Sequence, residues 1–98
     1  MSNIITIKNS KKRLESKIQK ESIINYAKQK GFVVFKIEKA NCYGVPDVVM
    51  IHKGITCFVE IKKENGKVSP TQMKRIKEIA ENGGNAMVVY GDEGAKTR

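Results

Sequence analysis

The spacing of apolar residues along the chain predicts two helices. Between residues 11 and 30 apolar side chains recur at helical intervals, and Gly31, a residue that commonly caps helix C-termini, follows. The second helix is predicted to begin at Ser69, because an N-cap serine, a proline at the first helical position and Gln72 at the third occur together. Asn82-Gly83-Gly84 ends this helix.

Segments rich in β-branched and aromatic residues predict four strands, at residues 32–37, 47–52, 55–63 and 86–90. The middle two form a hairpin that turns at Lys53-Gly54, and Pro46 suits the first position of a strand. Residues 1–10 are expected to be a short extended arm or disordered, and residues 91–98 a loose tail. The predicted order is α-β-β-β-α-β, a small mixed sheet flanked by helices in the α/β class.

One carboxylate interrupts the apolar side of the first predicted helix. At about 100° per residue, Glu21 lies on the same side as Leu14, Ile18 and Ile24. An inward-facing carboxylate costs free energy unless it has a partner or a function. The pattern therefore marks Glu21 as a candidate site residue.

Length and charge narrow the class of protein. Ninety-eight residues form a single domain, 1–98, with one small core. The formal net charge is +9, and residues 1–40 carry ten Lys or Arg against three Glu. Phosphate is the natural partner of such a chain, with simple solubility or attraction to an anionic membrane as alternatives. The absence of Trp and the few aromatic residues argue against an aromatic base-stacking platform of the single-strand-binding kind.

Other features point to the cytoplasm. Cys42 and Cys57 have neither metal-ligand spacing nor a matching pair of histidines, so reduced thiols are expected rather than a disulfide. The N-terminus does not have the pattern of a signal peptide, and no segment is long and apolar enough to span a bilayer. Neither a membrane nor a small-molecule cofactor is expected as a partner.

The strand predicted at residues 55–63 separates a polar face from an apolar face. Alternation places Glu60 and Lys62 on one face with Phe58, whereas the opposite face, which belongs against a helix, carries Cys57, Val59 and Ile61. Because Asp47 begins the neighbouring strand, two carboxylates and an ammonium are concentrated in a small volume. Two oxygen ligands plus waters and a substrate phosphate suit Mg²⁺.

Lys62 could hold the attacking water or stabilise the charge that develops on the phosphate. The alternative is structural: Asp47 caps a turn, while Glu60 and Lys62 form a solvated strand face. That alternative leaves an inward-facing Glu21 without a reason.

These residues resemble the PD-(D/E)xK nuclease superfamily through Pro46-Asp47 and Glu60-Ile61-Lys62. The resemblance is closer to its VRR-Nuc domains of the stand-alone phage or bacterial type, and it covers roughly residues 15–90. It adds Glu21, the run Gly44-Val45-Pro46-Asp47, the run Gly66-Lys67-Val68-Ser69 leading to Gln72, and an apolar last strand after Gly83-Gly84. One difference is that the Val-Arg-Arg for which the family is named has no counterpart in Val88-Val89-Tyr90-Gly91.

The resemblance implies a restriction-endonuclease-like core and a role for each matching residue. Asp47 and Glu60 would bind Mg²⁺, or Mn²⁺ in its place, with the Ile61 carbonyl as a third ligand. Lys62 would be the catalytic lysine, Glu21 a further acidic site residue, and Gln72 a residue that orients water, lysine or substrate. Gln72 could instead serve only the capping box, and both roles are compatible. The expected DNA contacts are Lys11, Lys12, Arg13, Lys20, Lys67, Lys74 and Arg75.

A surface this small favours reading DNA shape rather than base sequence. The resemblance implies a structure-selective endonuclease that forms homodimers and cuts four-way (Holliday) junctions, with a flap or fork endonuclease, or a less selective DNA endonuclease, as the second choice. The alternative from another class is a catalytically silent module that only binds nucleic acid. Two further residues carry open or minor expectations: Tyr43 contacts substrate or merely packs, and His52 is structural or exposed rather than catalytic.

Overall fold

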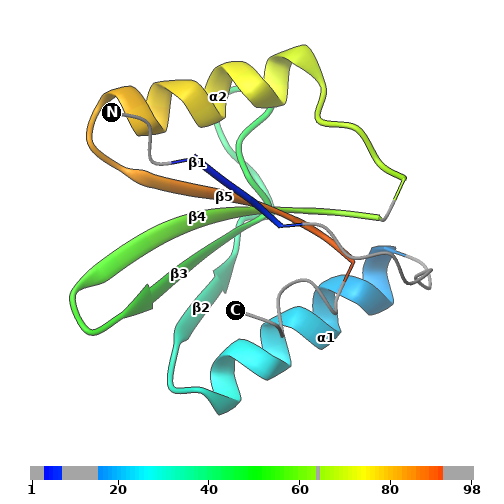
Figure 1. Cartoon of the computed structure of the whole chain (residues 1–98), viewed down its shortest axis with the longest axis vertical. Helices are drawn as coiled ribbons and strands as arrows, with labels where there is room; N and C mark the ends of the chain where they lie inside the picture. Colours follow the sequence, from blue (N-terminus) through cyan, green and yellow to red (C-terminus); the bar gives the residue numbers. More distant parts are fainter. Residues whose placement is uncertain (1–3, 8–15, 64, 92–98) are drawn as a thin grey trace.

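A computed structural model describes residues 4–7, 16–63 and 65–91 (Figure 1). The predicted helix start at Lys11 and the tail 92–98 lie outside these residues. Neither described helix is long and apolar enough to cross a membrane. The elements in chain order are β1 (Ile4–Ile7), α1 (Ser16–Gln29), β2 (Val33–Lys36), β3 (Val48–His52), β4 (Ile55–Lys62), α2 (Pro70–Glu81) and β5 (Asn85–Tyr90).

The strands form one mixed sheet in the order β1-β5-β4-β3-β2, with α1 and α2 on opposite faces (Figure 1). β2, β3 and β4 are antiparallel, whereas β5 runs parallel to β4 and to β1. The α/β class and both predicted helices are therefore confirmed.

The predicted order α-β-β-β-α-β omitted the first strand. Residues 4–7 are neither loose nor disordered, because Ile4–Ile7 pairs in parallel with Ala86–Val89. A parallel edge strand joins segments remote in the chain and needs no hairpin turn between them. The sequence around it therefore carries no local turn signal that would have revealed the pairing.

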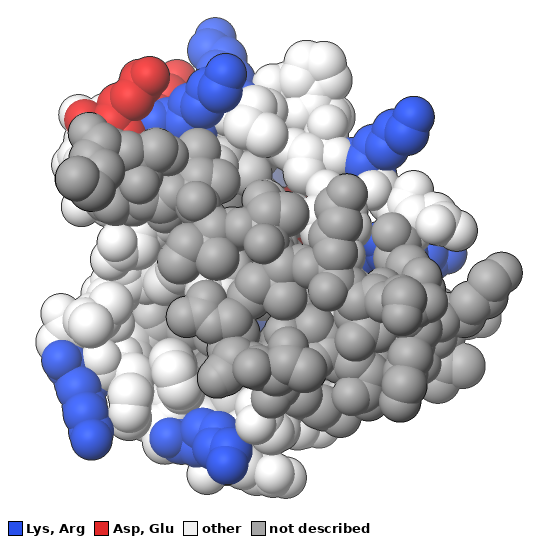
Figure 2. Space-filling model, viewed as in Figure 1, with Lys and Arg blue, Asp and Glu red and all other residues white. Residues whose placement is uncertain are grey.

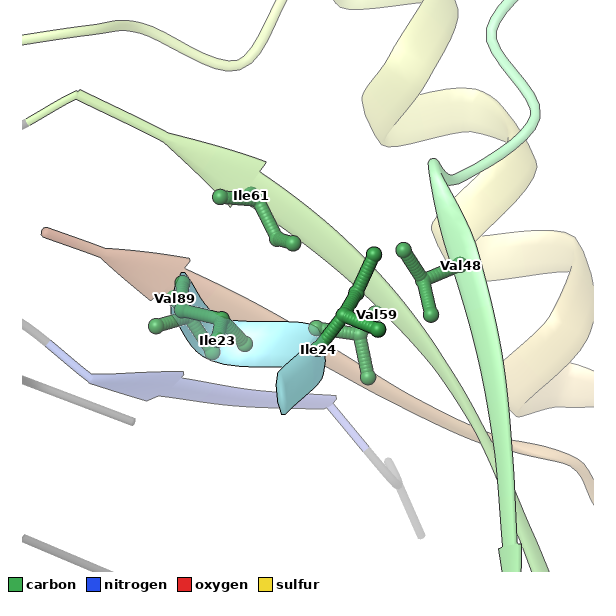
Figure 3. Close-up of a cluster of buried hydrophobic side chains, with 6 residues drawn as sticks. All are labelled: Ile23, Ile24, Val48, Val59, Ile61 and Val89. Atoms are coloured by element: carbon green, nitrogen blue, oxygen red, sulfur yellow. The ribbon is translucent and has the colours of Figure 1, made fainter. Parts of the chain in front are cut away.

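Two apolar clusters lie on the two faces of the sheet. On the α1 face, Ile23 and Ile24 of α1 pack against the sheet residues Val48, Val59, Ile61 and Val89 (Figure 3). On the α2 face, Ile76 packs with Ala86 and Val88. The predicted apolar face of the third strand is thus confirmed, and its helix is α1.

The predicted hairpin turn has the expected geometry. Lys53 has φ +50° and Gly54 has φ +84°, the pair of positive values that suits a two-residue hairpin loop. This turn sets the register of β3 and β4, in which Val48 lies opposite Val59. The register decides which residues meet at the far end of the two strands.

Candidate active site

Asp47 and Glu60 meet at the end of the β3–β4 pair opposite the hairpin turn. Asp47 immediately precedes Val48, so the register brings it beside the end of β4. Its Oδ2 accepts a hydrogen bond of 3.0 Å from the backbone N–H of Ile61. Pro46, which is fully buried, precedes Asp47 at the point where the chain enters β3. The predicted convergence of the two carboxylates is therefore present.

The backbone of Ile61 faces the same side as the Asp47 carboxyl group. In a strand, the N–H and C=O of one residue point to the same neighbouring strand. The Ile61 N–H points to Asp47, whereas the carbonyl of the next residue, Lys62, accepts from Gly91 on the other side. The Ile61 carbonyl is consequently directed to the Asp47 side, where the resemblance requires a third ligand.

Glu60 is a buried carboxylate with one partnered and one unpartnered oxygen. The residue is 2% exposed. Its Oε2 accepts a 2.9 Å hydrogen bond from Gln72 Nε2 and lies 3.6 Å from Lys62 Nζ. Its Oε1 is buried without a hydrogen-bond partner among the described residues. An unsatisfied buried charged oxygen is costly, so the geometry favours a cationic ligand at this atom.

The pKa of Glu60 reflects the same environment. Burial raises the pKa of its carboxyl group, and the negative charge of Asp47 raises it further, to about 7. Lys62 and Lys20 oppose this effect through their positive charges. A buried carboxylate whose pKa is raised further by a second carboxylate is a common feature of catalytic centres.

Gln72 forms the predicted capping box and, in addition, contacts the buried carboxylate Glu60. Its Oε1 accepts from the backbone N–H of Ser69 at 2.9 Å, and its backbone N–H donates to the Ser69 hydroxyl at 3.1 Å. Its Nε2 donates to Glu60 Oε2 in the same conformation. The capping box therefore fixes the side chain that orients the buried carboxylate.

Lys20 lies in the site, although the sequence had placed it among the DNA-binding residues. Its Nζ is 3.2 Å from Asp47 Oδ1, the carboxylate oxygen that does not accept from Ile61. The sequence carried no pattern that separates Lys20 from the other lysines of the first helix. Only the packing of α1 on the sheet reveals its partner.

The inward orientation predicted for Glu21 is wrong. Its side chain is 48% exposed and pairs with Lys36 Nζ at 3.0 Å. The helix buries Ile23, Ile24 and Ala27 instead, so its buried side is rotated away from Glu21. Lys36 pairs with Val48 in the sheet, so Glu21 lies at the site end of the molecule, where it pairs with Lys36 rather than with Asp47 or Glu60.

The residues expected to contact DNA are dispersed. Lys11, Lys12 and Arg13 lie outside the described residues. Lys67 and Lys74 are exposed, whereas Arg75 donates to Glu78 and to the backbone carbonyl of Tyr43. Figure 2 likewise shows Lys and Arg side chains at several separate places around this view rather than in one patch.

His52 and Tyr43 have different surroundings. The ring of His52 stacks on Phe32, and its Nδ1 lies 3.2 Å from the Gly31 carbonyl, which agrees with a structural role. The side chain of Tyr43 is not packed, because the residue is 87% exposed.

The donor set suits a hydrated divalent cation. Within the described part of the chain no group of three His, Cys, Asp or Glu side chains could enclose a metal. Asp47, Glu60 and the Ile61 carbonyl supply only oxygen, and Glu60 Oε1 has no other partner in that part. Mg²⁺ is usually bound by one or two carboxylates and keeps several waters, so these residues fit it.

The mixed sheet, its two helices and the carboxylate pair with its lysine define a nuclease domain. The family model of the VRR-NUC domain matches residues 4–93, and the chain belongs to this family. It is also similar to two solved structures described as a VRR_NUC domain and a VRR_NUC domain protein. The first has a TM-score of 0.75 and 24% identity over 83% of this chain and 89% of the other. The second has a TM-score of 0.68 and 24% identity over 89% and 85%.

The same fold occurs in Hjc, a Holliday junction resolvase from Archaeoglobus fulgidus. The TM-score is 0.61 with 15% identity, over 76% of this chain and 67% of that chain. At these identities the likeness to solved structures establishes the fold alone. No curated protein matches the chain.

Proposed function

We propose that this VRR-NUC domain is a Mg²⁺-dependent, structure-selective DNA endonuclease that hydrolyses phosphodiester bonds at four-way junctions as a homodimer. The observation that carries the proposal is the buried Glu60 beside Asp47, with Glu60 Oε1 unpartnered in the described structure. A module that only binds nucleic acid has no use for a buried carboxylate beside a second acid, because together they repel phosphate. In phosphodiester hydrolysis, by contrast, two neighbouring carboxylates can bind the divalent cation that assists the reaction.

Each site residue has a task in this reaction. Asp47, Glu60 and the Ile61 carbonyl would hold Mg²⁺, which when bound polarises the phosphate and lowers the pKa of a water. Lys62, whose Nζ lies 3.6 Å from Glu60, donates to the attacking water or stabilises the charge that develops on the phosphate. Gln72 keeps Glu60 in place. Lys20 offsets the charge of Asp47, and it would have to give up its contact with Oδ1 if that oxygen were to hold the cation.

Charge, fold and symmetry support the choice of substrate. The net charge of +9 favours a polyanion, and Hjc, whose fold is similar, is a junction resolvase. A two-fold symmetric homodimer would place two sites at related positions on a four-way junction. Flap or fork DNA is the alternative substrate.

The test compares cleavage of a four-way junction, a flap and a linear duplex of the same sequence in Mg²⁺, Mn²⁺ and EDTA. Wild-type protein is expected to cut the junction fastest and to be inactive in EDTA. Asp47→Asn and Lys62→Ala are each expected to lower the rate by at least about 100-fold. Lys28→Ala, an exposed lysine in the last turn of α1, is the matched control and should keep most of the activity.

Three results would overturn the proposal: a wild-type protein that cuts none of these DNAs, Lys62→Ala that cuts as well as wild type, or full activity in EDTA. Sedimentation equilibrium tests the assembly separately. The expected species has twice the monomer mass of 11.0 kDa. A protein that has the monomer mass both when free and when bound to the junction would contradict the homodimer.

A further inference from the structure

The loop between β2 and β3 spans residues 37–47, and within it residues 37–45 present an aromatic ring to solvent in the segment that leads to Asp47. Tyr43 is 87% exposed, the highest value among the exposed large hydrophobic residues of the described chain. It lies four residues before Asp47 in the chain. An aromatic ring contributes most when it is covered, so this ring lacks a cover in the described structure.

The backbone around Tyr43 is held against α2. Arg75 Nε donates to the Tyr43 carbonyl at 2.9 Å, and Arg75 is itself paired with Glu78. Gly44, at φ +84°, lies so close to the first turn of α2 that a Cβ atom there would be 2.6 Å from the Thr71 carbonyl oxygen. The position of the loop is therefore set by close contacts, while the Tyr43 ring projects away from them.

The same turn of α2 connects the loop to the buried carboxylate. Thr71, which Gly44 contacts, is followed by Gln72, whose Nε2 donates to Glu60. The loop and the candidate site thus share one rigid support. A substrate whose phosphate lies at Glu60 is within the immediate neighbourhood of this loop.

The loop also encloses a hollow. Its first nine residues line a space of about 530 Å³, with Asn41 and Lys39 exposed beside it. The space is large enough for a flat heterocyclic ring, and the exposed lysine and asparagine side chains suit a nucleotide, while the acidic Glu38 of the same lining is paired with Lys36 at 4.0 Å. Tyr43 is itself one of the residues that line the hollow, so the exposed ring and the hollow together form one candidate subsite.

We propose that Tyr43 stacks on an unpaired or splayed base at a DNA branch, and that the hollow of residues 37–45 receives this base. This inference rests on the proposed function, for which it names the element that selects branched DNA. Stacking on an aromatic ring is tolerant of sequence, and it needs a base whose face is accessible. A fully paired duplex offers such a face only at its ends. One ring suffices for one base, so the low aromatic content of the chain is no obstacle.

The experiment measures binding rather than cleavage, in EDTA, so that its outcome is independent of the nuclease activity. The probes are a four-way junction and a flap with 2-aminopurine at the branch point, and a linear duplex with the same label. Wild-type protein is expected to bind the branched probes more tightly and to quench their fluorescence. Tyr43→Ala is expected to abolish quenching and to weaken branched-DNA binding about tenfold, with less than about a twofold change for the duplex. Tyr43→Phe, which keeps the ring, should behave as wild type.

Ile55→Ala is the matched control, because Ile55 is 62% exposed and lies at the opposite end of β4, beside the hairpin turn. It is expected to change neither binding nor quenching. Quenching and branch preference that persist in Tyr43→Ala would overturn the inference. So would an equal loss on all three probes, a Tyr43→Phe variant as weak as Tyr43→Ala, or a wild-type protein without branch preference. Failure of the nuclease proposal has a different signature, namely absence of cleavage in Mg²⁺.

Discussion

The two faces of β4 differ at successive residues. On the α1 face, Val59 and Ile61 are buried among apolar side chains, which stabilises the fold. On the α2 face, Glu60 is buried just as deeply but retains an oxygen without a partner in the described structure. One helix packs against β2 and β4, the other against β5 and β1. The comparison teaches that the side chains of β4 on the α1 face only stabilise the fold, whereas on the α2 face β4 places a carboxylate whose burial lowers stability and which the proposed function requires.

The largest expected effect separates these two roles at Glu60. Glu60→Gln removes the charge but keeps the shape, so cleavage in Mg²⁺ is expected to fall by at least about 100-fold. The free energy of unfolding at pH 8 should stay the same or rise, because a desolvated charge is gone. Cleavage assays and urea unfolding measure the two quantities. A strong loss of stability with retained cleavage would reverse the assignment.

The opposite effect is expected on the α1 face. Ile23→Ala leaves a cavity among buried side chains and should lower the free energy of unfolding by about 2–5 kcal/mol. Cleavage per folded molecule should remain near the wild-type rate. If the variant does not fold, Ile23→Val, with an expected loss of about 0.5–1.5 kcal/mol, makes the same test. A variant that is fully folded yet inactive would show that this face takes part in the chemistry.

Stability without divalent cations is expected to depend on pH through Glu60. Its pKa is about 7 in the folded protein against an ordinary value of 4.5, so between these values the folded state holds a proton that the unfolded chain has released. The contribution of Glu60 to the free energy of unfolding, a few kcal/mol at most, is therefore fully present below about pH 4.5. It is lost as the pH rises to about 7.

Urea midpoints in EDTA at pH 5 and pH 8 measure this change. Glu60→Gln is the control, and in that variant the difference between the two pH values should shrink markedly. Equal pH dependence in both proteins would assign the effect to other groups.

A smaller effect is expected where the helix cap supports the site. Ser69→Ala removes the hydroxyl that accepts from Gln72 and should cost about 1 kcal/mol of stability. Cleavage should fall less than in Gln72→Ala, because only the latter loses the contact with Glu60. Equal losses of cleavage in the two variants would contradict a direct role of Gln72 at Glu60.

The smallest effect is expected at Lys20. Its ion pair with Asp47 is partly exposed and therefore worth little, but it occupies Oδ1, the Asp47 oxygen that Ile61 does not contact and that would be available to the proposed cation. Lys20→Ala should increase Mg²⁺ affinity by at most about fivefold, measured by isothermal titration calorimetry. Lys28→Ala is the control for a general loss of positive charge, and equal increases in both variants would show that Lys20 does not compete with the cation.

The sequence by itself determined both helices, four of the strands and the convergence of the two carboxylates. These features depend on local patterns: period-two alternation around Glu60, the N-cap at Ser69 and the two-residue turn at Lys53-Gly54. A hairpin with a defined turn has a defined register, and that register brings Asp47 beside Glu60. Local physics was sufficient for this part of the site.

Only the tertiary structure decided the rest, because it depends on how elements remote in the chain pack. No local turn motif in the sequence predicts the parallel pairing of β1 with β5. The rotation of α1 on the sheet, set by which side chains fill the core, turned Lys20 toward Asp47 and Glu21 toward Lys36. The contact of Gly44 with Thr71 brought the Tyr43 loop to the helix that orients Glu60. In each case the tertiary partner depends on a small difference in packing free energy, which cannot be predicted from the sequence of any single segment.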